Sequence, residues 1–138
     1  MYFLKGVFGM IFQMTEKGFV TEVGYGELNV SGEDQYGFRP YQLLVSSVAV
    51  CSGGVLRKVL EKMRISFQDI RVQADVERNE KEANRIEKIH LHFVIIGEEL
   101  DEKKIEKALI VTRKNCSMVQ SVKDSIDITE SFEIKASE

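Results

Sequence analysis

Two cysteines, Cys51 and Cys116, are the residues of this 138-residue chain that are best suited to chemistry. The thiolate is the form of cysteine that attacks substrates and binds metals, so the surroundings of each thiol decide its reactivity. Free cysteine is also a common buried packing residue. Three interpretations therefore stand side by side: buried spectators, a pair of metal ligands, or a redox couple.

The surroundings of the two cysteines differ. Cys116 follows Asn115. If Asn115 caps a short helix that begins there, Cys116 lies among free backbone N–H groups, which favour a thiolate. Arg113 and Lys114 add positive charge next to it. Cys51 lies inside an apolar stretch, and the nearest cation on its helical face is two turns away. Activation of Cys51 would therefore need a group from elsewhere in the protein.

Zinc is the metal that these residue types would suit, because it accepts cysteine and histidine ligands. The only two histidines, His90 and His92, alternate along an expected strand and point to the same side of it. The chain has no Cys-x-x-Cys and no His-x-x-x-His spacing, and nothing in the sequence brings the histidines to the cysteines. A polar sheet face explains them better, and we expect no metal site.

Cys51 is carried by an apolar stretch, residues 39–63, which predicts a long helix. Its single proline, Pro40, suits the first helical position, where the missing N–H has no partner to lose. Apolar residues cover most of the circumference, which is typical of a helix in the protein interior. Glycines inside helices are costly, so Gly53 and Gly54 indicate that something packs closely there. The apolar positions spaced mostly by three or four are Leu43, Leu44, Val48, Cys51, Val55, Val59 and Met63.

The elements around this helix give the order ββ-α-ββ-α-β, an α+β fold with antiparallel sheets. Before the helix, β-branched and aromatic residues predict a hairpin, with Gly24 and Gly26 at a bulge or bend. The expected ranges are strands 2–14 and 19–30, strands 65–76 and 86–96 around a polar turn, a helix over about 102–114, a short helical turn over 116–122 and a final strand 126–134. Asp101 is a plausible cap for the helix that follows it.

Composition limits the function classes. A chain of this length forms one domain, 1–138, with a real core. The net charge of −3 comes from well-mixed acidic and basic residues, and no basic patch indicates a nucleic-acid partner. No signal peptide is visible, and the long helix carries serines, glycines and charges that make it a poor membrane span. We therefore expect a cytoplasmic protein without a membrane partner.

Two motifs resemble one family. The segment RPYQLLVSSVAVC (residues 39–51) resembles the proline-to-cysteine helix of the OsmC/Ohr family, in which a leucine pair and small residues separate the proline from a cysteine. The segment NCSMV (residues 115–119) resembles the family's second cysteine motif, which usually reads Cys-Pro and continues into a short helix. The resemblance covers about residues 20–134.

This resemblance implies an α+β homodimer with intertwined chains and active thiols near the dimer interface. It also implies a cofactor-free thiol peroxidase that reduces organic hydroperoxides. In that chemistry Cys51 attacks the peroxide and becomes a sulfenic acid, and Cys116 resolves it to a disulfide. A small dithiol of the lipoyl type then reduces the disulfide.

The sequence departs from the family pattern in two places. The acidic residue that follows the proline in the family is Tyr41 here, and no arginine precedes Arg39 to polarise the thiol. Arg39 is the candidate for the missing charge. Tyr41 either donates a hydrogen bond to a peroxide oxygen or packs against its neighbours. The alternative function is therefore an OsmC-fold dimer without fast peroxidase activity, acting as a ligand-binding or thiol-redox module.

Overall fold

The computed structural model describes residues 9–137 and divides the chain into two compact units, one up to Leu44 and one from Val45 onward. Residues 2–8 of the expected N-terminal hairpin lie outside the described residues. Because the units are separate bodies, the expectation of a single domain over 1–138 stays a prediction.

The first unit contains a small antiparallel sheet of three short strands in the order β1-β2-β3. The strands are β1 (Gln13–Met14), β2 (Phe19–Glu22) and β3 (Glu27–Val30). The expected hairpin is therefore present but has a third strand, because the chain bends at Gly24 and Gly26, the second of the two predicted alternatives, and so divides the expected strand 19–30. Val23 and Gly26 exchange backbone hydrogen bonds of 3.0 Å across this turn.

Helix α1 (Pro40–Lys62) begins at the proline, as its sequence predicts. Its buried residues in unit two are Val48, Ser52, Leu56 and Leu60, at a constant spacing of four. The prediction of burial all round is wrong for a single chain, since Val50 is 73% exposed. Within the described residues, α1 is also the one helix long and apolar enough to cross a membrane. Its all-round apolar character is equally typical of a helix with packing partners on two sides.

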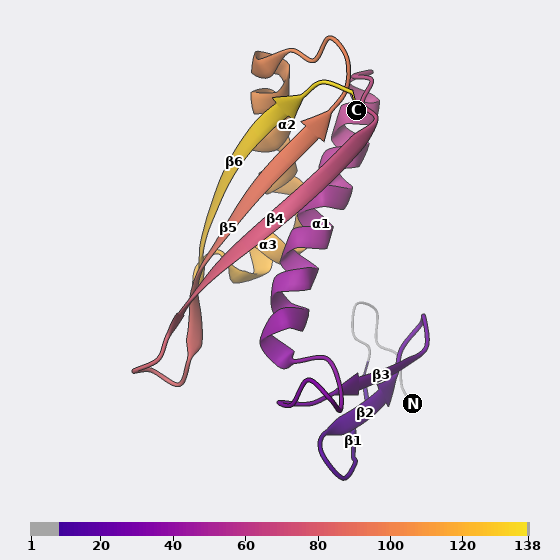
Figure 1. Ribbon diagram of the computed structural model, residues 1–138, viewed down its shortest axis with the longest axis vertical. Coiled ribbons are helices and arrows are strands. Elements are labelled where there is room, and N and C mark those ends of the chain that lie inside the picture. The colour runs from indigo at the N-terminus through magenta and orange to yellow at the C-terminus, as the bar shows by residue number, and fades with distance from the viewer. Residues whose placement is uncertain (1–8, 138) are drawn as a thin grey trace. The chain divides into compact units, whose positions relative to one another are not determined.

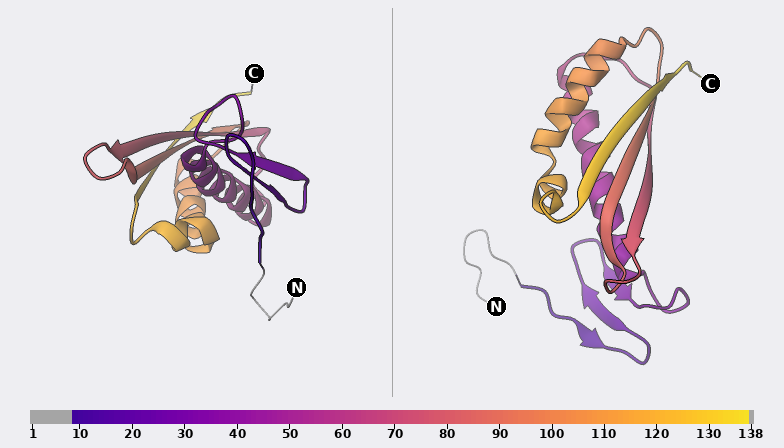
Figure 2. Two further views of the ribbon diagram at one scale, coloured as in Figure 1. Left: turned by 90° about the horizontal axis from the view of Figure 1, so that it is seen from below. Right: turned by 90° about the vertical axis from the view of Figure 1, so that its left-hand side faces the viewer.

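The second unit is built on a sheet in the order β4-β5-β6, with all of its helical elements on one face (Figures 1 and 2). The strands are β4 (Asp69–Asn79), β5 (Arg85–Ile96) and β6 (Asp127–Lys135). Strands β4 and β5 are antiparallel, but β6 runs parallel to β5. The expectation of purely antiparallel sheets is therefore wrong at β6. The helical segment between β5 and β6 carries the chain back to the starting end of β5, which makes the next strand parallel.

That crossover contains α2 (Glu102–Asn115) and α3 (Ser117–Val122). The predicted cap is confirmed, because the Asp101 side chain accepts a 3.0 Å hydrogen bond from the Lys103 backbone N–H. The buried residues of α2 are Ile105, Ala108, Leu109 and Thr112. They face the core side of β5, whose buried residues are Ile89, Leu91, Phe93, Ile95 and Ile96.

The open face of the sheet carries the two histidines, as the alternation predicts. His90 contacts Thr129 Oγ1 at 2.7 Å through Nδ1 and Ser131 Oγ at 2.8 Å through Nε2. His92 contacts the same Ser131 Oγ at 2.7 Å through Nδ1 and Glu133 Oε1 at 3.2 Å through Nε2. These contacts join β5 to β6 along their parallel register.

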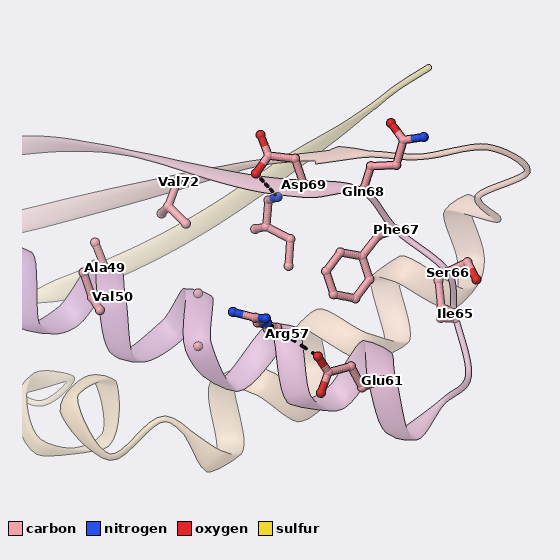
Figure 3. Close-up of a pocket in the computed structure, with 13 residues that line it drawn as sticks. Ala49, Val50, Arg57, Glu61, Ile65, Ser66, Phe67, Gln68, Asp69 and Val72 are labelled. Atoms are coloured by element: carbon pink, nitrogen blue, oxygen red, sulfur yellow. Dashed lines mark hydrogen bonds and ion pairs between the residues drawn. The ribbon is translucent and has the colours of Figure 1, made fainter. Parts of the chain in front are cut away.

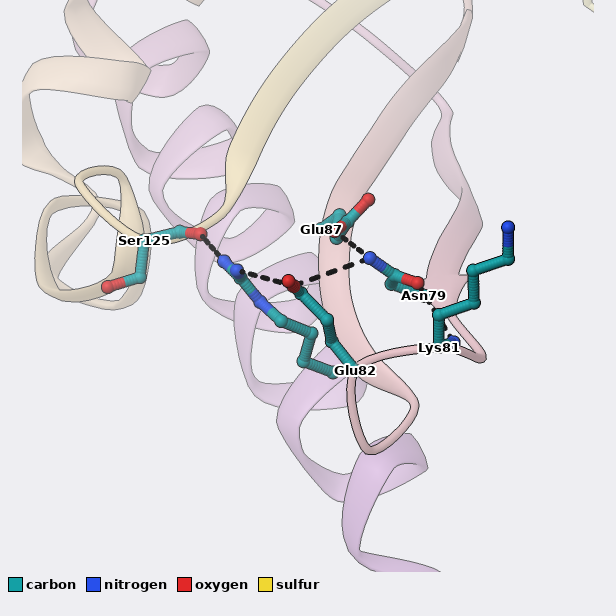
Figure 4. Close-up of polar contacts among 6 residues, drawn as sticks. Asn79, Lys81, Glu82, Glu87 and Ser125 are labelled. Atoms are coloured by element: carbon teal, nitrogen blue, oxygen red, sulfur yellow. Dashed lines mark hydrogen bonds and ion pairs between the residues drawn. The ribbon is translucent and has the colours of Figure 1, made fainter.

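The turn between β4 and β5 is held by side chains (Figure 4). Asn79 Nδ2 donates to Glu87 Oε1 at 2.8 Å, and Asn79 Oδ1 accepts from the Lys81 backbone N–H at 3.0 Å. Arg85 reaches from this turn to the Ser125 carbonyl at 3.4 Å, at the end of the crossover. The turn is therefore tied to the start of β6.

Ser52 provides a test of the packing beneath α1. Its hydroxyl is buried and has no hydrogen-bond partner among the described residues. An unpaired buried hydroxyl costs about 1–3 kcal/mol, and alanine is the better helix former. We expect Ser52→Ala to raise the free energy of unfolding by about 1 kcal/mol in urea denaturation.

The matched control is Ser46→Ala, an exposed serine on the same helix. It should gain only the difference in helix propensity, about 0.5 kcal/mol or less. A Ser52→Ala variant that is no more stable than Ser46→Ala would mean that the buried hydroxyl has a partner after all.

Candidate functional site: a pair of thiols beside the start of α3

Cys116 lies at the single-residue joint between α2 and α3. Its backbone is extended, its N–H donates to the Thr112 carbonyl at 2.9 Å, and its carbonyl accepts from the Gln120 N–H at 3.0 Å. Cys116 itself therefore occupies the position before α3, and the prediction that Asn115 caps this helix is wrong. The Asn115 side chain instead donates back to the Val111 carbonyl at 2.8 Å.

The two cysteines, 65 positions apart in sequence, meet at this joint. Cys51 Sγ lies 3.6 Å from the hydroxyl oxygen of Ser117, the first residue of α3. The Cys116 thiol is a further hydrogen-bond partner of Cys51. Both cysteines are free; Cys51 is half-buried and Cys116 is fully buried. The fold thus presents one accessible thiol backed by one inaccessible thiol.

The pKa of Cys51 is lowered. Partial burial raises it, but the hydrogen bonds outweigh burial. In decreasing order, these come from the Met118 backbone N–H, the Ser117 hydroxyl, the Cys116 thiol and the Ser117 backbone N–H. The first N–H groups of a helix have no acceptor within it, so they are free to stabilise a thiolate.

The pKa of Cys116 is raised, mainly because burial disfavours its thiolate. The Val119 backbone N–H opposes this shift, whereas the neighbouring Cys51 adds to it. The prediction that the start of α3 favours a thiolate at Cys116 is therefore wrong for this residue. The Met118 N–H lowers the pKa of both thiols, but at Cys116 burial outweighs it, whereas at Cys51 it does not.

Ser117 and Met118 are the site residues that the sequence analysis missed. Their signal was present, because a residue directly after a helix break supplies an unpaired backbone N–H. What the sequence lacks is the direction of these groups, which depends on how α3 packs against α1.

Arg39 and Tyr41, the other two predicted site residues, lie in the first unit. Arg39 Nε is 3.8 Å from Asp34 Oδ1, and its guanidinium carbon is 4.9 Å from the centre of the Tyr41 ring. The Tyr41 hydroxyl accepts a 3.3 Å hydrogen bond from the Gln42 side chain. Each residue thus has local packing partners, and their catalytic and substrate-binding roles stay predictions.

A groove of about 780 Å³ runs along the second unit between α1 and the start of β4 (Figure 3). Ala49, Val50 and Phe67 line it, and the Arg57–Glu61 ion pair, 3.5 Å between Nε and Oε1, lies at its side. Cys51 is not among its lining residues. Within residues 9–137, no group of three or more histidine, cysteine or acidic side chains is arranged to hold a metal ion.

The fold and the thiol pair define a class: an α+β protein in which a cysteine on a long helix faces a second cysteine at the break after α2. The OsmC-like family model matches residues 32–131, which is most of the chain and includes both cysteines. The chain belongs to the OsmC-like family.

Individual relatives share this fold at modest identity. Protein YhfA of Escherichia coli K12 is 26% identical over 98 residues, which cover 70% of this chain and 73% of YhfA. A hypothetical protein from Aquifex aeolicus VF5 is 29% identical, with a TM-score of 0.84 and coverage of 96% of this chain and 98% of that one. An organic hydroperoxide resistance protein OsmC from Legionella pneumophila has a TM-score of 0.68 over 92% of this chain and 98% of its own. At 18% identity, that last likeness shows the fold alone.

The unequal thiols predict unequal alkylation. In the native protein, iodoacetamide should modify Cys51 at a rate whose pH midpoint lies below that of the same cysteine in urea, because the folded pKa is lowered. Cys116 should react slowly, because it is buried and its pKa is raised. Peptide mass spectrometry after timed labelling separates the two sites.

The urea-unfolded chain is the control, in which both midpoints should approach the ordinary cysteine value. Equal native rates at Cys51 and Cys116, or a Cys51 midpoint that unfolding does not change, would contradict the hydrogen-bonded arrangement.

Proposed function

We propose that this protein is a thiol peroxidase that reduces organic hydroperoxides. The observation that carries the proposal is the pairing of an accessible Cys51, whose pKa is lowered, with a buried Cys116, whose pKa is raised. Attack on a peroxide needs a thiolate, whereas the second cysteine acts only after the first is oxidised. Membership of the OsmC-like family and the hydroperoxide resistance proteins among its structural neighbours support this assignment.

The proposed reaction has three balanced steps. The Cys51 thiolate attacks the terminal peroxide oxygen, the O–O bond breaks, and the alkoxide takes a proton and leaves as alcohol. This step oxidises Cys51 to a sulfenic acid. The Cys116 thiol then attacks that sulfur, and water leaves as a Cys51–Cys116 disulfide forms. A small dithiol, of the lipoyl type, reduces the disulfide by two exchanges and becomes a cyclic disulfide itself.

The assignment of roles follows from accessibility. A hydroperoxide and an external dithiol must both reach Cys51, which is half-buried, while Cys116 needs to contact only its neighbour. No cofactor enters this scheme. The reaction would run in the cytoplasm, where reducing dithiols maintain thiols.

Single-cysteine variants test the proposal. We expect Cys51→Ser to abolish rapid consumption of cumene hydroperoxide in stopped-flow assays with dihydrolipoamide, because serine is not a peroxide nucleophile. Cys116→Ser should keep one fast turnover but accumulate sulfenic acid, which dimedone labels. Wild type should prefer cumene hydroperoxide to hydrogen peroxide. Wild-type consumption no faster than that of a free thiol would refute the peroxidase and favour the alternative below.

The alternative is an OsmC-like protein without fast peroxidase activity, which binds a small ligand or exchanges thiols. It is favoured by one observation: within the described part of the chain, the main causes that lower the pKa of Cys51 are hydrogen bonds, and no cation is among them. Thiol–disulfide exchange with a small dithiol would then persist while hydroperoxide consumption stays slow.

We further propose that the protein acts as a homodimer in which a second copy covers the bare side of α1. Val50 is 73% exposed there and lines the groove of Figure 3. A helix that is apolar all round but buried on one side in a single chain suits such an interface.

Val50→Glu should therefore convert the dimer to a monomer in size-exclusion chromatography with light scattering, because a carboxylate would be buried at the interface. Ile110→Glu is the matched control, since Ile110 is an exposed apolar residue on α2. A monomeric wild type, or a Val50→Glu variant that stays dimeric, would contradict this assembly.

A further inference from the structure

Ser117 contacts the sulfur of Cys51 through its side chain. Its hydroxyl oxygen lies 3.6 Å from Cys51 Sγ, and in the neutral state either group can donate. A thiolate has no proton, so ionisation of Cys51 leaves the serine hydroxyl as the only possible donor. Hydrogen bonds to charged groups are the stronger ones. The contact therefore strengthens when the thiolate forms and selectively stabilises it.

The backbone of the same residue acts in the same direction. The Ser117 N–H, at the start of α3, lowers the pKa of Cys51, as does the N–H of Met118 that follows it. The identity of residue 117 thus sets the number of donors. Serine supplies a hydroxyl and an N–H, alanine would keep only the N–H, and proline would have neither.

Other charged groups do not take over this role. The titratable group that faces Cys51 is Cys116, whose own pKa is raised by burial, so that Cys116 itself stays a neutral thiol. Arg113, near the end of α2, is engaged elsewhere: its Nη1 donates to the Ile128 carbonyl at 2.8 Å and lies 3.4 Å from Glu130 Oε1. The main stabilisation of the Cys51 thiolate therefore comes from uncharged donors, among which the Ser117 hydroxyl contacts the sulfur.

We propose that Ser117 is a thiolate-stabilising residue of this site, which activates Cys51 through its hydroxyl. The importance of Ser117 for catalysis rests on the proposed peroxidase function. Its effect on the ionisation of Cys51 does not, because that effect is measured without any peroxide. The residue is exposed and begins a short helix, so substitutions there are compatible with folding.

The experiment compares Ser117→Ala, Ser117→Thr and Ser117→Pro by the pH dependence of Cys51 alkylation with iodoacetamide, followed by peptide mass spectrometry. Ser117→Ala should slow alkylation at pH 7 by about threefold to tenfold and move its midpoint to higher pH, the effect of losing one donor to a thiolate. Ser117→Thr should restore the wild-type profile, because it keeps a hydroxyl at the same position. Ser117→Pro should slow alkylation further than Ser117→Ala, since it removes the N–H as well.

Ser121→Ala is the matched control. Ser121 lies one turn further along α3, and its hydroxyl donates to the Ser117 carbonyl at 2.7 Å and not to Cys51. It should leave the Cys51 profile unchanged. Circular dichroism of each variant checks that the fold is retained.

The proposal is overturned if Cys51 alkylation in Ser117→Ala has the same pH midpoint as in wild type. It is also overturned if Ser121→Ala shifts that midpoint as much as Ser117→Ala does. Peroxide assays on the same variants separate this outcome from the proposed function. A Ser117-dependent midpoint in a protein that does not reduce hydroperoxides would refute the peroxidase and keep the role of Ser117. Rapid peroxide reduction together with an alkylation midpoint that does not depend on Ser117 would support the peroxidase and refute the role of Ser117.

Discussion

The contact between the start of α3 and the sulfur of Cys51 is the interaction on which the site depends. It joins two elements that are distant in sequence, α1 and the α2–α3 joint, and it exists only because α2 stops at Asn115. Had the helix run on, the N–H groups of residues 117 and 118 would have been consumed by carbonyls within it. The break thus creates the donors, and the packing of α1 on the sheet brings the thiol to them.

The sequence predicted this framework well where side-chain periodicity is unambiguous. The alternation along β5 and the stripe of α2 each describe one buried face, so their orientation follows from the residues. The direction of β6 did not follow, because a strand reads the same in either sense and only the crossover determines it. The burial of α1 was overestimated, because apolar residues around a helix do not show which of them pack within one chain, and Val50 is 73% exposed.

The site was predicted in part for a related reason. Both cysteines were recognisable as chemical groups, and the sequence placed Cys51 inside the helix that begins at Pro40 and Cys116 next to the helix break at Asn115. Which thiol would ionise was not readable, because it depends on burial and on the direction of N–H groups. Cys116 has the cations next to it in sequence, yet burial controls its pKa. Cys51 has none near it on its helix, yet the hydrogen bonds reach it across space.

The two histidines on the open sheet face carry a consequence for the arrangement of hydrogens. Ser131 has one hydroxyl proton but contacts a ring nitrogen of both His90 and His92, so it donates to one ring and accepts from the other. The Glu133 carboxylate can only accept, so a neutral His92 donates to it from Nε2 and accepts from Ser131 at Nδ1. Ser131 then accepts from Nε2 of a neutral His90, whose Nδ1 accepts from the Thr129 hydroxyl. All four hydrogen bonds thus run in one direction, from Thr129 to Glu133, and each ring carries its proton on Nε2. The parallel pairing of β5 and β6 therefore fixes a tautomer as well as a register.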